Sequence, residues 1–155
     1  MAEQNEPEIE GLTGLVENLT GKDVSFEMGI ARTVSAQGSG TVSESLVYRI
    51  DSGGKMDVIN TAAAVLAAGK DMTAKNILAN VLVAGGDAHV DRGSLRVAVA
   101  GHDLHANRST IGVVISKQGI TGDNNRILLD RQGAILFGAA FGALFGLISW
   151  LLRKR

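Results

Sequence analysis

The chain has 155 residues, of which 45% are hydrophobic and 20% charged, and its formal net charge is −1. This composition predicts a globular domain rather than a disordered chain, and the near-zero charge excludes a general basic surface for nucleic acid. The sequence contains no cysteine, which excludes disulfide bonds and thiolate metal sites. Its 20 glycines accompany a single proline, a balance that predicts tight turns at regular places rather than a flexible linker.

Residues 1–20 form an acidic N-terminal segment. Its first ten residues include four glutamates and no lysine or arginine, and no apolar run follows them. A secretory signal peptide needs both a basic start and an apolar run, so we expect none here. From residue 5 the segment fits the repeat described next after a shift of one residue, which predicts a degenerate capping coil.

A repeat of sixteen residues occupies residues 21–132, with Gly21 at position 1 of its first copy. Position 1 is glycine in five copies and position 3 is aspartate in four. We expect the glycine position to be a corner that needs a positive φ or has no room for a Cβ atom. Apolar residues alternate at positions 4 and 6 and again at positions 11, 13 and 15, the period of strands with one face turned inward.

Sixteen residues are too few for a pair of helices but suit one turn of a β-solenoid, with a short strand, a corner, a longer strand and a second corner. The sequence therefore predicts an all-β, single-domain β-solenoid of about seven to eight coils, stacked about 4.8 Å apart. The alternative is an antiparallel sandwich of hairpins, which would not need the same residue types at the same position of each copy.

Stacking would place residues sixteen apart side by side, so His89 would lie beside His105 and Asp87 beside Asp103. Two carboxylates and two imidazoles on one outer face are a ligand set suited to Zn²⁺, which makes these four residues a candidate metal site. The alternative is a solvated face on which the aspartates shape turns and the neutral histidines stack. His102 is expected to point the other way or to lie in the corner.

Position 8 carries amide and guanidinium side chains, namely Asn60, Asn76, Arg92, Arg108 and Asn124. The two successive asparagines predict a short amide ladder. The two successive arginines would be in like-charge contact and need an acidic neighbour, for which Asp91 and Asp103 are the candidates. The arginine pair is either an anion site or a screened surface pair.

The longer strand carries a second apolar row. If positions 11, 13 and 15 point inward, the residues between them point outward and form a contiguous apolar strip, which usually marks an interaction surface. The candidate interface consists of Leu66, Leu82, Ala98, Val114, Leu78 and Ala64. Alternatively the strip packs against the N-terminal segment or lies along a bilayer.

Residues 133–152 read GAILFGAAFGALFGLISWLL and contain no charge. Such a segment is long enough to cross the hydrocarbon core of about 30 Å as a helix, and Trp150 near its end suits the membrane interface. The sequence predicts one C-terminal transmembrane helix followed by a basic tail at residues 153–155. The alternative is a buried core helix.

Small residues recur at four-residue spacing in this segment, at Ala134, Gly138, Gly142 and Gly146. A stripe of small residues lets two membrane helices approach closely, which predicts helix packing there, although a lone helix also tolerates glycine in lipid. The short tail and the missing signal peptide resemble a tail-anchored protein, so we expect a single-pass membrane protein with a cytoplasmic solenoid. The basic tail favours the opposite orientation.

The coils GGDAHVDRGSLRVAVA, GHDLHANRSTIGVVIS and GKDMTAKNILANVLVA are short, rich in Val and Ile, and begin with a glycine corner. In this pattern, over residues 21–132, the chain resembles the bactofilin-type proteins, which are polymer-forming bacterial β-solenoids. The resemblance implies end-to-end or lateral polymerisation on a membrane without nucleotide. The C-terminal position of the expected anchor, directly after the last coil, departs from that pattern.

The sequence contains no GxSxG, HExxH or Walker A motif and no GxGxxG between a strand and a helix, so we expect neither an enzyme nor a cofactor. The best-supported function is a membrane-anchored structural or scaffold protein that self-associates or docks partners through its β-solenoid. The alternatives are a non-catalytic accessory subunit of a larger membrane complex and a metal- or ligand-binding module. The expected partners are membrane lipid and either further copies of the chain or a membrane protein.

Overall fold

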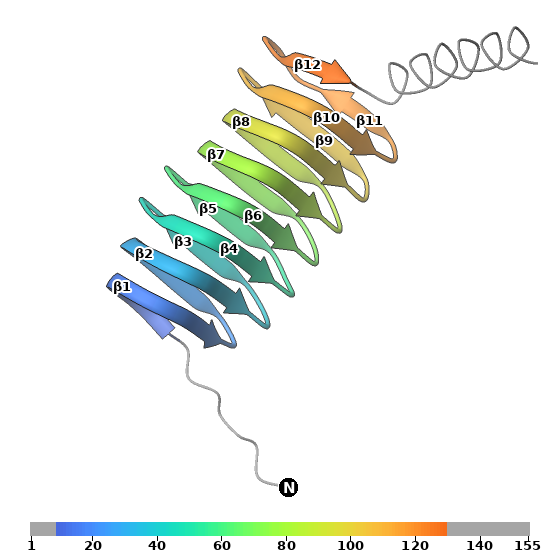
Figure 1. The fold of residues 1–155 in the computed structure, drawn as a ribbon. Coiled ribbons are helices and arrows are strands. Elements are labelled where there is room, and N and C mark those ends of the chain that lie inside the picture. Colours follow the sequence, from blue (N-terminus) through green and yellow to red (C-terminus); the bar gives the residue numbers. More distant parts are fainter. Residues whose placement is uncertain (1–8, 130–155) are drawn as a thin grey trace, which may run out of the picture.

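The structure is a computed structural model that describes residues 9–129. Over these residues the chain is an all-β solenoid of about seven turns with about 16 residues in each coil, as predicted (Figure 1). The sandwich alternative is wrong, because the strand pairs of the described coils run parallel. Within residues 9–129 there is no helix with the length and apolarity needed to cross a membrane. The predicted membrane segment, including Ala134, Gly138, Gly142 and Gly146, lies outside the described residues.

One sheet winds through all the coils of the described part of the chain. Its strands are β1 (Ile9–Gly21), β2 (Val24–Ala36), β3 (Gly40–Ser43), β4 (Leu46–Ser52), β5 (Met56–Ile59), β6 (Ala62–Ala68), β7 (Met72–Ala84), β8 (Ala88–Ala100), β9 (Asp103–Asn107), β10 (Thr110–Ser116), β11 (Gly119–Thr121) and β12 (Arg126–Leu129). Short strands stack in one layer and longer strands in the other (Figure 1). In β2, β7 and β8 the two strands of a coil join through the corner into one of 13 residues.

The register between coils follows the repeat. Residues sixteen apart pair throughout, for example Val58 with Ala74 and Leu66 with Leu82. The first coil is displaced, because β1 pairs with β2 at a spacing of fifteen from Gly14 to Gly21. A displacement of one residue from the sixteen-residue register is the size of the shift that the sequence predicts here, and residues 5–8 of the predicted capping coil lie outside the described residues.

The core fills the space between the two layers. Positions 4 and 6 point inward as predicted, and Met72 and Ala74 are fully buried. Position 11 also points inward, with Leu95 and Ile111 buried. Positions 14 and 16 complete the core in place of the predicted positions 13 and 15.

The prediction for the end of the longer strand is therefore wrong. Four members of the candidate interface are 0–2% exposed and belong to the core: Leu66, Leu82, Ala98 and Val114. The cause is a bulge-like irregularity at position 12, which is missing from the register of the successive long strands. Ala63 and Val65 pair with the next coil but Ala64 does not, so two consecutive side chains face outward and the alternation shifts by one residue.

The glycine corner is required by close stacking of the backbone. A Cβ atom on Gly85 or Gly101 would overlap the carbonyl oxygen of the glycine sixteen residues earlier, and neither residue has a positive φ. The corner with a positive φ is at position 8 instead, where φ lies between 47° and 56° at Met28, Glu44, Asn60, Asn76, Arg92, Arg108 and Asn124. Of the two explanations predicted for the glycine position, the lack of room for a Cβ atom is correct.

Replacing Gly85 with alanine is expected to lower the free energy of unfolding by about 1–3 kcal/mol, because the backbone of the neighbouring coil must move to admit the methyl group. Gly40→Ala is the matched control, since a Cβ atom there would meet its nearest neighbours at an ordinary 3.7 Å. That variant should unfold at the same urea concentration as the parent or slightly above it. Equal losses in both variants would contradict the stacking explanation.

Met28→Asn is expected to raise the free energy of unfolding by about 0.5–1 kcal/mol. Met28 is 61% exposed, so its side chain contributes little packing, and its φ of 47° suits asparagine better than methionine. Thr41→Asn, at an exposed strand position without a positive φ, should not stabilise the fold. Thermal unfolding followed by circular dichroism measures both changes.

Candidate functional site

The two outer faces of the solenoid differ in polarity. The short-strand face, at positions 5 and 7, is mainly polar and includes Thr41, Asp57, Thr73, Lys75, His89, Asp91, His105 and Asn107. The long-strand face, at positions 10, 12, 13 and 15, is mainly apolar and includes Leu46, Tyr48, Ala62, Ala64, Val65, Ala67, Leu78, Val81, Val83, Val97, Val99, Val113 and Ile115. Several of its side chains are well exposed, including Leu78 at 62% and Ile115 at 57%. The long-strand face is therefore the main candidate for a binding surface.

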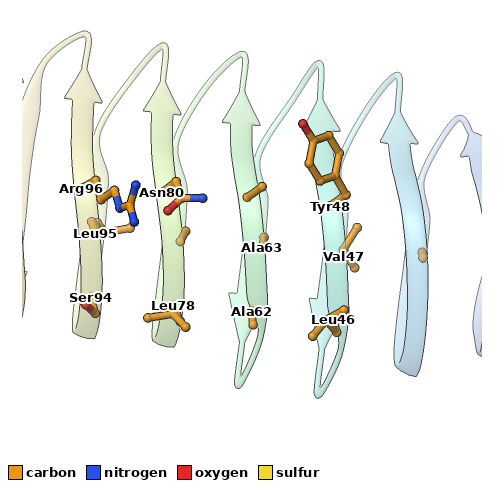
Figure 2. A pocket seen from close by; sticks show the side chains of 13 residues that line it. Leu46, Val47, Tyr48, Ala62, Ala63, Leu78, Asn80, Ser94, Leu95 and Arg96 are labelled. Carbon is orange, nitrogen blue, oxygen red and sulfur yellow. The ribbon is translucent and has the colours of Figure 1, made fainter.

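A groove of about 520 Å³ crosses the long-strand face over β4, β6, β7 and β8 (Figure 2). Its floor includes the three alanines at 62–64, whose small side chains leave a depression in the sheet. Tyr48 lies at one end of the groove and Arg96 at the other, with Asn80 beside Arg96 (Figure 2). The groove is therefore apolar at its centre and has polar groups at its ends.

Charge is unevenly distributed along the long-strand face. In the N-terminal coils, Arg49 pairs with Asp51 at 2.5 Å, and the hydrogen bond that Arg49 donates to this carboxylate raises the pKa of the Arg49 guanidinium. From β6 through β10, Arg96 is the one charged residue on this face. None of the described residues forms an ion pair with Arg96. The central part of the face thus combines an apolar sheet surface with a single uncompensated cation.

Of the predicted interface, only Leu78 and Ala64 lie on the long-strand face. Sequence reasoning missed the outward valines and Ile115, although a signal was present in the early copies. Positions 13 and 15 hold Arg49 and Asp51 in one copy and Thr33 and Ser35 in another, whereas position 14 is apolar in the described copies. Polar residues at positions 13 and 15 indicate an outward orientation.

The histidine ladder forms as predicted. The rings of His89 and His105 stack with their centroids 4.6 Å apart and their planes at 27°. His102 lies closer to this group than expected, with its Nδ1 atom 3.9 Å from Oδ1 of Asp87. In the described coils no three His, Asp or Glu side chains are arranged to hold a metal ion, so the structure gives the site at Asp87, His89, Asp103 and His105 no support.

The aspartates of position 3 have a structural role. Oδ1 of Asp87 accepts a hydrogen bond from the backbone N–H of Asp103 at 3.1 Å, and Oδ1 of Asp71 accepts one from the N–H of Asp87 at 3.2 Å. This backbone hydrogen bond, together with the nearby Lys55 ammonium group, holds the pKa of Asp71 below its ordinary value. The carboxylates therefore connect successive corners, as the turn interpretation predicts.

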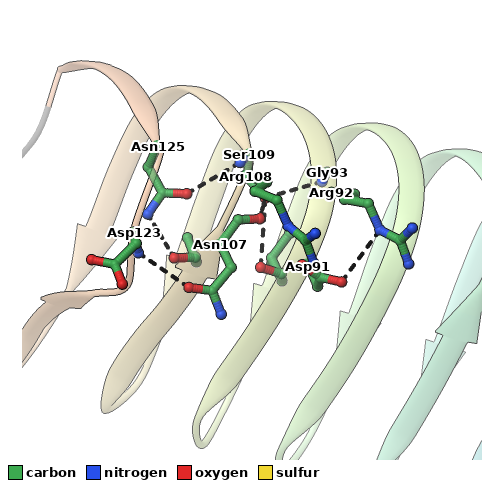
Figure 3. A network of polar contacts seen from close by, with 10 residues as sticks. Asp91, Arg92, Gly93, Asn107, Arg108, Ser109, Asp123 and Asn125 are labelled. Atoms are coloured by element: carbon green, nitrogen blue, oxygen red, sulfur yellow. Dashed lines mark hydrogen bonds and ion pairs between the residues drawn. The ribbon is translucent and has the colours of Figure 1, made fainter.

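The corner at position 8 carries a second ladder of polar contacts (Figure 3). Asn76 Nδ2 donates to Oδ1 of Asn60 at 2.8 Å, which confirms the predicted amide ladder. Asp91 lies between the two arginines, 2.9 Å from Arg108 and 3.3 Å from Arg92 (Figure 3). The hydrogen bond from Arg108 lowers the pKa of Asp91. Because one carboxylate contacts both guanidinium groups, the arrangement favours a screened surface pair over an anion site.

A buried serine completes this corner. Ser109 is 2% exposed, and its hydroxyl accepts a hydrogen bond from the N–H of Gly93 at 3.0 Å and donates one to the carbonyl oxygen of Asn107 at 2.8 Å. The side chain of Asn125 then accepts a hydrogen bond from the N–H of Ser109 at 3.1 Å (Figure 3). These bonds satisfy the backbone where the chain leaves the ladder at the corner.

Comparison with models of known protein families, with curated proteins and with solved structures finds no match. The class of this protein is therefore defined by its fold and by the polarity of its outer surface. The described chain is a parallel β-solenoid with one polar and one apolar outer face.

Asp91→Asn is expected to remove stability at neutral pH but not in strong acid. Because the pKa of Asp91 is lowered in the folded state, its carboxylate stabilises the fold above the ordinary Asp range, and this contribution is lost as the pH falls through the lowered pKa. The difference in urea midpoint between parent and variant should stay constant from pH 7 to about pH 5. It should shrink below about pH 4, the ordinary Asp pKa, as the pH falls through the lowered pKa.

Arg108→Gln provides the control, since it removes the main cause of the lowered pKa. In that background Asp91→Asn should produce a smaller difference at neutral pH, because only Arg92 remains as a partner. An undiminished pH dependence would show that another group is responsible.

Proposed function

We propose that this protein is a membrane-anchored scaffold that associates with further copies of itself through the long-strand face. The observation that carries the proposal is the contrast between the two outer faces, because a polar face suits water and an exposed apolar face of this extent suits a partner. This assembly requires no catalytic or ligand-binding side chains, only a flat apolar surface that extends along the rod.

The size of the face is adequate for a partner. Coils stacked about 4.8 Å apart and strands of about 3.3 Å per residue give a surface of roughly 29 Å by 23 Å over the six coils from β4 to β12. That corresponds to about 660 Å² on each copy, close to the roughly 800 Å² per partner that specific protein interfaces bury. Association on this scale can be stable while remaining sensitive to single substitutions.

A second copy fits the face better than a lipid surface does. Surfaces that lie on membranes combine apolar residues with flanking lysine, arginine and tryptophan. At the described outward positions of the longer strands there is no lysine or tryptophan, Tyr48 is the one aromatic residue, and Arg96 is the one charge over the central coils. Small and branched aliphatic side chains on a flat sheet suit the packing of two sheets about 10 Å apart.

In this proposal the apolar segment 133–152 holds the solenoid at a membrane. Confinement to a membrane raises the local concentration of the solenoids, so a modest face-to-face affinity is sufficient. The stripe of Ala134, Gly138, Gly142 and Gly146 would provide a second contact within the bilayer. The resemblance to bactofilin-type proteins implies polymerisation on a membrane, end-to-end or lateral, and the lateral form agrees with this proposal.

Replacing Leu78 and Ile115 together with glutamate is expected to reduce self-association at least tenfold, because two charges would be buried in each half of the apolar contact. Both side chains are mostly exposed, so the fold should be retained. The measurement is light scattering of the detergent-solubilised full chain over a range of protein concentrations.

The matched control is Thr41→Glu with Ile59→Glu, which adds the same charge to exposed positions of the short-strand face. This variant should assemble like the parent. If the long-strand variant assembles equally well, self-association does not use that face and the proposal is wrong.

A further inference from the structure

We propose that two copies pair on the long-strand face with their coils in opposite order, about a two-fold axis between β7 and β8, so that Arg96 of each copy meets Asn80 of the other. This inference rests on the proposed self-association and specifies its geometry. It is carried by Arg96, the one charged residue over the mainly aliphatic central coils from β6 to β10, with which none of the described residues forms an ion pair.

If the strands of the two copies stay aligned, symmetry leaves two ways to bring the same flat face of two copies together as a closed pair. The two-fold axis lies in the plane of contact and runs either along the solenoid or along the strands. With the axis along the solenoid, each coil faces itself and its strand is reversed. With the axis along the strands, each position of the repeat faces the same position, and the order of the coils is reversed.

The axis along the solenoid brings like charges together and leaves Arg96 without an acceptor. Position 13 would lie near the axis, so Arg49 of one copy would approach Arg49 of the other. Reversal of the strand would place Arg96 against the outward Val97 and Val99 of the facing coil. A guanidinium group buried against valine without an acceptor is strongly unfavourable.

With the axis along the strands, Asn80 of the other copy provides an acceptor for Arg96. An axis between β7 and β8 brings these two strands together across the contact, and Asn80 and Arg96 both occupy position 12. Figure 2 shows the Arg96 side chain lying over the sheet on the side of Asn80, within the groove. The side-chain oxygen of Asn80 can accept a hydrogen bond from the guanidinium group of the other copy, and symmetry forms this pair twice.

The remaining coils also match in size in this arrangement. The strand β6 faces β10, which sets the small Ala67 opposite the large Ile115. The strand β4 faces β12, which sets Tyr48 opposite Leu128, each of them 65% exposed. Two exposed side chains that find no cover within their own chain would cover each other.

The two most N-terminal coils stay outside the contact. With six coils overlapping from β4 to β12, β1 and β2 extend beyond the partner. These strands carry the exposed pair of Arg32 and Glu17, joined at 3.3 Å, which can remain in water. The proposed axis thus buries the aliphatic central coils. It places Arg49 with Asp51 on β4, and Arg126 on β12, in the outermost coils of the contact, where the polar rim of an interface stays in water.

Single cysteines test the geometry without background, because the chain has no cysteine of its own. Val65 and Val113 occupy position 13 of β6 and β10. In the proposed pair, Val65 of one copy lies opposite Val113 of the other at about the 10 Å spacing of stacked sheets, whereas two Val65 residues are offset by three coils, or about 14 Å, along the solenoid as well. A bis-maleimide of roughly 10 Å span distinguishes these distances.

The experiment uses full-length Val65→Cys and Val113→Cys chains of different tagged mass, co-expressed in membranes and treated with the reagent. We expect the mixed product to exceed either self-product at least fivefold, and a Thr41→Cys chain on the short-strand face to yield no dimer. Strong self-products from both single variants with little mixed product would establish the axis along the solenoid and overturn the inference.

A third outcome separates this inference from the proposed function. If no cross-linked product forms and light scattering shows that Leu78→Glu with Ile115→Glu still associates like the parent, the copies associate elsewhere, and both the geometry and the role of the long-strand face are wrong. If association persists and is lost in Leu78→Glu with Ile115→Glu, yet the mixed product is absent, only the geometry proposed here is wrong.

Discussion

Parallel pairing of residues sixteen apart is the constraint on which the rest of the molecule depends. Each coil satisfies its backbone with the coils on either side, and side chains at equivalent positions therefore stack into ladders. The close approach of successive backbones excludes a Cβ atom at Gly85 and Gly101, and it brings the carboxylate of Asp87 to the next corner. The ladders of asparagine and histidine arise from the same register rather than from separate interactions.

The same register separates the two outer faces. Alternation along a short strand places positions 4 and 6 in the core and leaves positions 5 and 7 in water, where polar residues predominate. The longer strand behaves differently, because the irregularity at position 12 turns two consecutive side chains outward and returns position 14 to the core. Its outer surface gains a row of valines in this way, and that row makes the face a candidate for association.

Most of the fold follows from the sequence because the repeat and the inward positions of the short strand are strictly periodic. The orientation of Leu66 and Leu82 does not, because strict alternation assumes a regular strand and the bulge-like residue at Ala64 has no distinctive side chain. The polar residues Arg49 and Asp51 indicate that positions 13 and 15 face outward, but this is visible only when the same position is compared across copies. The positive φ at Arg92 and Arg108 is equally hidden, since arginine is not a residue that this conformation favours.

The number of stacked coils also sets the length of the solenoid. Because every coil from β2 onward pairs in the same register, the gain or loss of one sixteen-residue copy would change the length of the rod by about 4.8 Å and leave the stacking of the other coils intact. The distance between the two ends of the rod therefore changes by one coil spacing for each copy that is added or removed. Duplication of a single copy would lengthen the protein without disturbing the fold already present.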